Sequence, residues 1–350
     1  MLKAKWISYS LNFKFPAGTS RGVLVSKPSW FLKVIDLAEP DIFGIGEVSV
    51  IPGLSLDDEK SIGPALDALC SRINDYGRWL EEFGNSFPAI CFGLETALTD
   101  LKSGGNRVFF KNTFTQGNKG IPVNGLIWMG NFEEMRQRIS AKLSEGFRVI
   151  KLKVGAIDFE SEVALLSEMR QLFSPDELTI RLDANGAFAP DMALEKLKRL
   201  SDYHIHSIEQ PIKSGQHEQM AELCSKSPVP IALDEELIGV YDAEAKMNLL
   251  ETLRPEYIIL KPGLLGGFGH ADEWIRIAEK LKIGWWATSA LESNIGLNAI
   301  AQWTFNTSNP LTQGLGTGQL FHNNIGSPLE IRDALLYHNP ENVWNLQPIL

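Results

Sequence analysis

From about residue 121 onward, the chain alternates between short apolar segments and longer segments with helical periodicity. The apolar segments predict strands at 121–127, 148–154, 178–184, 205–210, 230–235, 257–262, 284–289 and 312–316. Strands that alternate with helices pair in parallel through right-handed crossovers. Eight such units predict an α/β fold, a (β/α)8-type barrel. The alternative is an open doubly wound sheet, but no G-x-G-x-x-G turn follows the first strand, and GLLGGFG at 263–269 is interpreted as a barrel loop.

The first hundred or so residues have a different pattern. Residues 2–50 alternate in polarity between Gly and Pro punctuation, which predicts antiparallel strands, and 59–80 and 88–102 are predicted to be helices. Strands followed by helices indicate a small α+β domain. We therefore expect an α+β domain over 1–115 and the barrel over 116–320.

The composition excludes some classes of binding partner. The 350 residues carry a formal charge of −10 and no extended basic run, which argues against nucleic acid or an anionic membrane surface as partner. An anionic small-molecule substrate would need locally placed cations or a metal. Cys70, Cys91 and Cys224 show no C-x-x-C spacing, and no apolar run is long enough to span a bilayer, so we expect a cytoplasmic protein. Oligomeric state leaves no signal in the sequence.

Charged residues end five consecutive predicted barrel strands. They recur at intervals of 25 to 30 residues and always at the same place in the repeating unit: Lys151 and Lys153, then Asp183 with Asn185, then Glu209, Asp234 and Lys261. Side chains alternate along a strand, so Lys151 shares a face with Lys153, and Asp183 shares one with Asn185. The carboxyl ends of barrel strands carry the chemistry of this fold. We expect these side chains to meet at the barrel mouth.

Three carboxylates in one barrel mouth repel each other unless a cation joins them. Asp183, Glu209 and Asp234 supply hard oxygen ligands without Cys or His, which favours Mg²⁺, with Mn²⁺ as the alternative ion. His204 and His206 have the opposite strand parity and are predicted to lie outside the site. The competing interpretation is a set of exposed loop carboxylates paired with loop lysines.

The lysines fit the same site. Lys153 and Lys261 lie four strands apart and are expected to face each other across the barrel. A lysine near Mg²⁺ and another lysine has a lowered pKa and can act as a base near neutral pH. Mg²⁺ on a substrate carboxylate would stabilise the dianion formed when an α-proton leaves. A structural or charge-tuning role for Lys151 stays open.

These segments resemble a known family. K-x-K at 151–153, RLDANGAF at 181–188, IEQP at 208–211, ALDE at 232–235 and ILKPGLLGG at 259–267 resemble the enolase superfamily in its muconate-lactonizing-enzyme-like subgroup. GIGEVSVIPGLS at 44–55 resembles the N-terminal capping domain of that subgroup, which a C-terminal segment of about 321–350 would complete. SALESNIGL at 289–297 and GLGTGQLF at 314–321 resemble strand ends of the o-succinylbenzoate synthase family.

The resemblance implies a reaction and a set of roles. The reaction is the syn-elimination of water from 2-succinyl-6-hydroxy-2,4-cyclohexadiene-1-carboxylate, which gives 2-succinylbenzoate for menaquinone synthesis. Lys153 would remove the α-proton, Lys261 would stabilise the enolate, and Lys151 would assist. The three carboxylates would hold the metal. Substrate contacts are expected from Arg21, Asn185, Ser289, Glu292, Gly314 and Gly316.

Other activities share this machinery. An N-succinylamino-acid racemase or a dipeptide epimerase would use the same lysines and carboxylates. A dipeptide epimerase typically has Asp-x-Asp at the eighth strand end to hold the substrate ammonium, whereas this chain has GLGTG at 314–318. A sugar-acid dehydratase would use histidine bases, and this chain has no histidine at the corresponding strand-end positions. A non-catalytic barrel would have lost a lysine or a metal ligand, and all five positions are intact.

Overall fold

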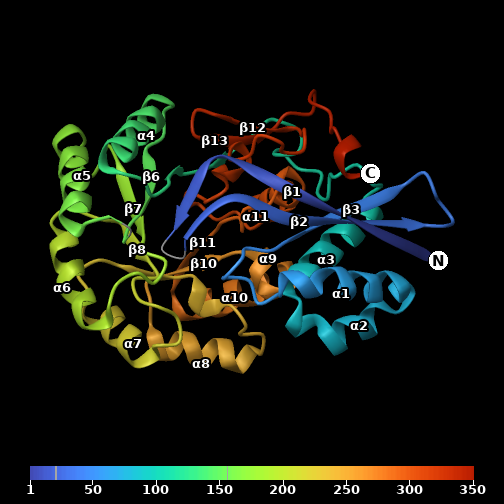
Figure 1. Ribbon diagram of the computed structural model, residues 1–350, viewed down its shortest axis with the longest axis horizontal. Coiled ribbons are helices and arrows are strands. Elements are labelled where there is room, and N and C mark those ends of the chain that lie inside the picture. Colours follow the sequence, from blue (N-terminus) through green and yellow to red (C-terminus); the bar gives the residue numbers. More distant parts are fainter. Residues whose placement is uncertain (20–21, 156) are drawn as a thin grey trace.

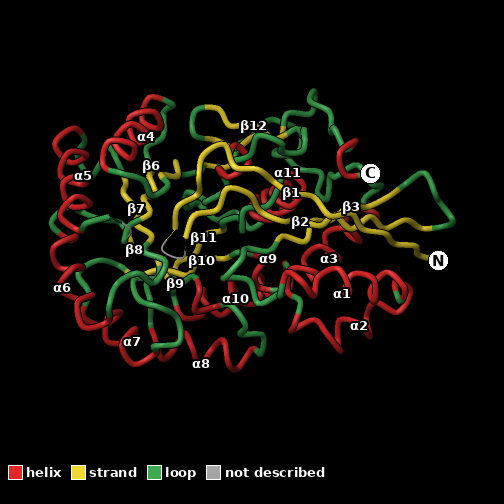
Figure 2. Tube along the Cα trace, in the orientation of Figure 1, coloured by secondary structure: helices red, strands yellow, loops and turns green. Residues whose placement is uncertain are grey.

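The computed structural model describes residues 1–19, 22–155 and 157–350. It contains an N-terminal antiparallel sheet with three helices beside it, and a parallel sheet wrapped by helices (Figure 1). The strands β1 (Leu2–Thr19) and β2 (Gly22–Asp36) extend from the N-terminal sheet to the parallel sheet (Figures 1 and 2). The two parts are in contact there, because Gly18 of β1 forms an isolated bridge with Met129. No helix in the described ranges is long and apolar enough to cross a membrane.

The N-terminal sheet has the strand order β1-β2-β3. Its strands are β1 (Leu2–Thr19), β2 (Gly22–Asp36) and β3 (Phe43–Ser49). The helices α1 (Glu59–Ser71), α2 (Tyr76–Phe83) and α3 (Pro88–Lys102) follow. The single helix predicted at 59–80 is interrupted after Ser71, where Asn74 exchanges two hydrogen bonds with the backbone of Leu2, of 2.7 and 2.9 Å, and so ties the break to β1.

The parallel sheet has the order β11-β10-β9-β8-β7-β6-β5. Its strands are β5 (Gly125–Ile127), β6 (Val149–Lys153), β7 (Thr179–Asp183), β8 (Ser207–Glu209), β9 (Ile231–Leu233), β10 (Tyr257–Leu260) and β11 (Gly284–Ala287). The connections contain α4 (Phe132–Ser144), α5 (Phe159–Leu172), α6 (Pro190–Ser201), α7 (His217–Lys226), α8 (Ala243–Leu253), α9 (Pro262–Leu265), α10 (Phe268–Leu281) and α11 (Asn294–Asn306). The strand-helix alternation predicted this barrel-type fold, and the prediction is confirmed.

The barrel closes through irregular backbone where the eighth strand was expected. Residues 312–316 form no strand and make two isolated parallel bridges, between Val123 and Gln313 and between Thr288 and Gly314. The buried Arg181 side chain crosses the interior, donates to the Thr312 carbonyl at 2.8 Å and stacks on Trp286. Among the described residues, backbone hydrogen bonds join only Gln313 and Gly314 to the neighbouring segments, and side chains hold Thr312, so the regular strand expected over five residues is limited to two isolated bridges.

The first predicted barrel strand, 121–127, is divided between two sheets. Residues Ile121–Pro122 form β4, which pairs with β13 (Leu335–His338), and β13 also pairs with β12 (Leu329–Arg332). Only Gly125–Ile127 pairs with the barrel strand β6. C-terminal residues also contact β1, because Tyr9 and Ser10 exchange hydrogen bonds with Asn323. The division at 115 and 320 stays a prediction.

Two glycines bring β3 against α3. A Cβ on Gly44 would overlap the Ala97 carbonyl, and one on Gly46 would overlap the Gly93 carbonyl. The strand therefore lies directly on the helix backbone, which buries Val48 and Leu94 in the N-terminal core. This packing fixes the distance of β3 from α3, and with it the position of Glu47, the residue after Gly46.

We expect Gly46→Ala to lower the free energy of unfolding by about 3 kcal/mol, because an inserted methyl group meets backbone that cannot move aside. Urea denaturation followed by circular dichroism measures it. Gly77→Ala, on α2 with no neighbouring atom near the added carbon, is the control and should change stability by about 1 kcal/mol or less. Equal stability of the two variants would show that β3 does not pack on α3 as described.

Candidate active site

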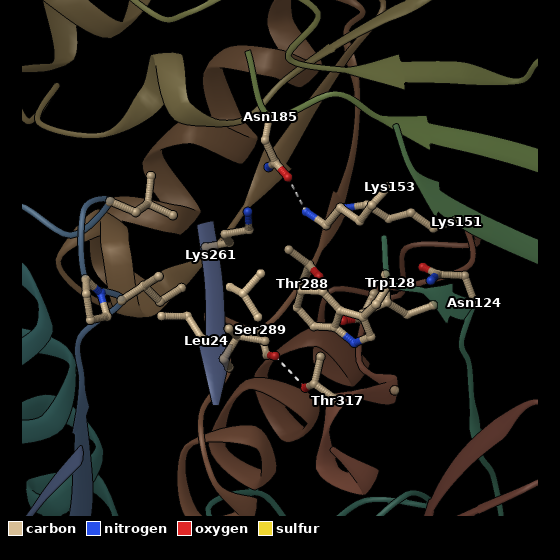
Figure 3. Close-up of a pocket in the computed structure, with 18 of the residues that line it drawn as sticks. Leu24, Asn124, Trp128, Lys151, Lys153, Asn185, Lys261, Thr288, Ser289 and Thr317 are labelled. Carbon is tan, nitrogen blue, oxygen red and sulfur yellow. Dashed lines mark hydrogen bonds between the residues drawn. The ribbon is translucent and has the colours of Figure 1, made fainter. Parts of the chain in front are cut away.

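One cavity lies at the carboxyl ends of the parallel strands. Its volume is about 250 Å³, just below the usual range of about 300–1,000 Å³ for small-molecule sites. The N-terminal part supplies its apolar cover, namely Val23, Leu24, Ile51, Pro52 and Leu54. The barrel supplies the polar wall, namely Asn124, Lys151, Lys153, Asn185, Lys261, Thr288, Ser289 and Thr317 (Figure 3). The site is therefore built by both parts of the chain.

Three lysines face three carboxylates at the floor of this cavity. Lys151 Nζ lies 2.8 Å from an Asp183 oxygen and 2.6 Å from a Glu209 oxygen, and Lys153 Nζ lies 2.5 Å from Asp183. Lys261 forms an ion pair with Asp234 and lies 3.8 Å from Glu209. Each of these six residues is less than a tenth exposed. Buried charges of this kind are tolerated because each sign compensates the other. We call these six residues the strand-end array.

Strand register explains how the strand-end array forms. Lys153 is paired with Asp183 across β6 and β7, and Asp183 with Glu209 across β7 and β8. Parallel strands in register place these side chains side by side on the interior face. The even spacing seen in the sequence thus becomes one layer of charge.

The two lysines that face each other differ in protonation preference. Burial and the neighbouring Lys151 lower the pKa of Lys153, although Asp183 opposes the shift. Burial also lowers the pKa of Lys261, but the charges of Asp234 and Glu209 outweigh it, so its pKa is raised above the ordinary value. Burial and the Asp183 charge raise the pKa of Glu209 to about 8. Lys261 therefore favours the ammonium form more strongly than Lys153 does.

The carboxylates fit a hard divalent cation by donor type and by position on three adjacent strands. Glu209 Oε1 is buried and accepts no hydrogen bond within the described part of the chain, so it has a lone pair available for a ligand. In the arrangement seen, no three His, Cys, Asp or Glu side chains of the described residues come close enough to hold a metal, because lysine ammonium groups lie between the carboxylates. The assignment of Asp183, Glu209 and Asp234 as Mg²⁺ ligands stays a prediction from their donor type.

Lys153 is further positioned by two neighbours. Its ammonium group donates to Asn185 Oδ1 at 2.7 Å, and Asn185 in turn donates to Glu235 at 3.1 Å. The Trp128 ring centroid lies 6.0 Å from Lys153 Nζ. Figure 3 shows Lys153 and Lys261 pointing toward one another, with Asn185 beside them. The arrangement places an amine on each side of the space that a ligand would enter.

The wall at the seventh and eighth strand positions is neutral and polar. Ser289 Oγ and Thr317 Oγ1 are 2.5 Å apart, and Thr288 Oγ1 donates to the Gly314 carbonyl at 2.8 Å. A Cβ on Gly314 would overlap the Thr288 hydroxyl, which explains the glycine there by packing. Gly316 lies against the Asn124 carbonyl and also lines the cavity.

Of the predicted substrate contacts, Glu292 and Arg21 are not found in the cavity wall, for different reasons. Glu292 does not line the cavity, since its carboxylate is fully buried and accepts the Ala290 N–H at 2.6 Å. The sequence argument placed it in the cavity because it follows a strand end, but the chain turns there and points it toward the N-terminal sheet. Arg21 lies outside the described residues.

His204 and His206 lie just before β8, at the opposite end of that strand from Glu209, and neither lines the cavity. His204 is exposed, and the His206 ring stacks on Tyr257 with centroids 5.1 Å apart.

Several residues that line the cavity escaped the sequence analysis. Asn124 is buried, and its Oδ1 accepts no hydrogen bond from any described residue. Trp128, Thr288 and Thr317 also reach the cavity. Asn124 and Trp128 flank β5, and the charge pattern on which the search relied has no member there. Extending the search to every polar or aromatic residue at a strand end would have included them.

Comparison with known proteins agrees with the architecture. The family described as Enolase C-terminal domain-like matches residues 134–341. The o-succinylbenzoate synthase of Desulfotalea psychrophila is 51% identical, over 93% of this chain and 96% of that protein.

Solved structures give the same result. The crystal structure of MenC from Desulfotalea psychrophila superposes with a TM-score of 0.84 at 46% identity and covers 96% of this chain and 99% of that one. A dipeptide epimerase from Enterococcus faecalis, solved with Mg and a dipeptide, has a TM-score of 0.84 at 19% identity over 96% of both chains and shares the fold. The chain therefore belongs to the enolase superfamily, in the o-succinylbenzoate synthase family.

Proposed function

We propose that the chain is an o-succinylbenzoate synthase, a lyase that removes water from 2-succinyl-6-hydroxy-2,4-cyclohexadiene-1-carboxylate. The proposal is supported by 51% identity to a synthase over nearly the whole length of both proteins. The product, 2-succinylbenzoate, is an intermediate of menaquinone synthesis, and we assign the chain to that pathway. The cytoplasmic location expected from the sequence stays a prediction.

The charge of the cavity carries the proposal. Of the described residues that line it, three are lysines and none is a carboxylate. The strand-end carboxylates lie beneath the lysines, each at most a few per cent exposed. A ligand with two carboxylates matches such a wall, whereas the α-ammonium group of a dipeptide would find no carboxylate among the described lining residues, which at the eighth strand position are Gly314, Gly316 and Thr317. This argues against a dipeptide epimerase.

The side chains can perform a syn-elimination with one base. The Lys153 amine takes the proton from the carbon that carries the carboxylate, and the C–H electrons form the enolate. The same group, now an ammonium, returns that proton to the hydroxyl as its C–O bond breaks, so water leaves from the face where the proton was removed. The ring becomes aromatic, and the amine is restored.

Lys261 acts from the opposite face. Its ammonium group stabilises the negative charge of the enolate without exchanging a proton. Lys151 neutralises Asp183 and Glu209 and limits the movement of Lys153. Mg²⁺ held by Asp183, Glu209 and Asp234 would supply positive charge against the substrate carboxylate. Mn²⁺ has similar ligand preferences.

The rest of the wall would orient the substrate. Asn185, Ser289, Gly314 and Gly316 line the cavity, and we assign them to substrate contact together with Asn124 and Thr317. Their hydroxyl, amide and backbone groups suit the succinyl arm. Val23, Leu24 and Leu54 would cover the ring and exclude water.

An N-succinylamino-acid racemase is the second candidate, because its substrate also has two carboxylates and Lys153 and Lys261 already face each other (Figure 3). Racemisation requires both lysines to exchange a proton, whereas syn-elimination requires one.

We expect Lys153→Ala to reduce dehydration of the cyclohexadiene substrate about a thousandfold, because it removes the general base and acid. The wild type should exchange the α-proton of an N-succinylamino acid of one hand with solvent deuterium, and Lys153→Ala should abolish that exchange. Lys261→Ala should impair dehydration. The α-proton of the other enantiomer should still not exchange in this variant. The exposed Lys198→Ala is the control. Efficient exchange of both enantiomers with no dehydration would favour the racemase.

We expect Asp183→Asn to weaken Mg²⁺ binding, measured by isothermal titration calorimetry, and to lower activity about a hundredfold or more, because a charged oxygen ligand is lost. Circular dichroism should show a folded protein. Asp176→Asn, at an exposed position, should match the wild type in both measurements. Full activity of Asp183→Asn in the presence of a chelator would refute the metal assignment.

A further inference from the structure

A buried polar cluster joins the N-terminal sheet to the barrel beside the cavity. Its charged members are Lys27 on β2, Glu47 on β3 and Glu292 after β11, and all three side chains are fully buried. None of them lines the cavity. Buried charges are costly unless they are paired and hydrogen-bonded, so a cluster of this kind at an interface calls for an explanation.

Glu47 caps a helix in the other part of the chain. Its Oε1 accepts the Ser293 N–H at 2.8 Å, and its Oε2 accepts the Ser293 hydroxyl at 2.5 Å and the Gly296 N–H at 3.1 Å. Ser293 is the N-cap residue of α11 and itself accepts the Ile295 N–H, and Gly296 lies in the first turn, which has no acidic residue. A carboxylate at a helix N-terminus is stabilised by free N–H groups and by the helix dipole. Glu47 thus supplies the negative charge that α11 lacks.

Lys27 extends the connection to the loop before α11. Its ammonium group donates to the hydroxyl of Ser49 at 2.6 Å and to that of Ser29 at 3.1 Å. Ser29 donates to Glu47 at 2.9 Å, and Ser49 donates to the Ala290 carbonyl at 3.2 Å. The N-terminal sheet therefore holds both the start of α11 and the loop that leads into it.

That loop, residues 288–293, forms part of the cavity wall. Thr288, Ser289 and Leu291 line the cavity, and Ala290 between them is held through both its N–H and its carbonyl. Leu291 has φ of 61°, a left-handed conformation that costs a residue with a Cβ about 1–2 kcal/mol. Strained backbone of this kind persists only where surrounding contacts hold it. Glu47 and Ser49 supply such contacts.

We propose that Glu47 is a positioning residue for the active site: from the N-terminal sheet it caps α11 and so holds the 288–293 loop in the strained form that turns Ser289 and Leu291 toward the substrate. The role extends the function proposed above, on which its kinetic readout rests. It also explains two glycines. Gly46 lets β3 lie close enough to α3 to place Glu47 at the start of α11. A Cβ on Gly296 would lie 2.6 Å from Glu292 Cγ and 3.2 Å from Glu47 Oε2.

The chain offers a matched control. Glu95 on α3 is also a carboxylate of the N-terminal part, and it accepts the Phe268 N–H at 2.6 Å, at the start of the barrel helix α10. No residue of α10 lines the cavity. Glu47→Gln and Glu95→Gln therefore each remove one carboxylate that joins the same two parts, but only the first touches the helix that follows the cavity loop.

We expect both variants to lower the melting temperature, and only Glu47→Gln to raise KM for the cyclohexadiene substrate, by about tenfold, with a smaller change in kcat. Amide hydrogen exchange of residues 288–296 should rise in Glu47→Gln and stay unchanged in Glu95→Gln. Ser293→Ala removes one of the three hydrogen bonds to Glu47 and also the bond from the Ile295 N–H, and it should raise KM by less than Glu47→Gln does. Ser293→Thr keeps the hydroxyl, so its KM should match that of the wild type.

Equal KM values and equal exchange of residues 288–296 in Glu47→Gln and Glu95→Gln would overturn the proposal and leave Glu47 a purely structural contact. The exchange measurement does not depend on the reaction. If the wild type dehydrates no cyclohexadiene, the proposed function fails, while the exchange comparison still decides the role of Glu47. If Glu47→Gln does not fold, Ser293→Ala carries the same comparison.

Discussion

The compensation of three buried carboxylates by three buried lysines is the interaction on which this site depends. Without the cations, Asp183, Glu209 and Asp234 could not share the floor of one cavity in ionised form. The lysines reach them because the strands are parallel and in register. The same contacts leave the amines of Lys153 and Lys261 at the cavity surface, where a substrate carboxylate would meet them. The lysine–carboxylate contacts therefore stabilise the strand ends and also place the reactive amines.

The second constraint is the closure of the cavity by a separate part of the chain. The barrel supplies the charged groups, but residues 22–24, 51, 52 and 54 cover them. The cover must keep a fixed position over the lysines, which the contacts of β3 provide. Gly44 and Gly46 allow β3 to lie on α3, and Glu47 reaches α11 from that position. One short motif thus connects the core of the N-terminal part to the wall of the active site.

Regular features of the sequence predicted the fold and the charged floor, because both repeat with the βα unit. Alternation along the strands was enough to group Lys153, Asp183, Glu209 and Lys261. Irregular features were harder to predict. The backbone at 312–316 is held by Arg181 and isolated bridges, and Glu292 turns away after a tight loop. The role of Glu47 depends on a contact between residues about 250 positions apart, and a single sequence holds no local signal for such a contact.

A crystal structure of the wild type with Mg²⁺ and 2-succinylbenzoate tests the central claim most directly. The account predicts the metal between Asp183, Glu209 and Asp234, with Lys153 and Lys261 released from their ion pairs and placed on opposite faces of the ring carbon that bears the carboxylate. A metal bound elsewhere, or a ligand bound in the cavity while both lysines keep their ion pairs with the carboxylates, would contradict it.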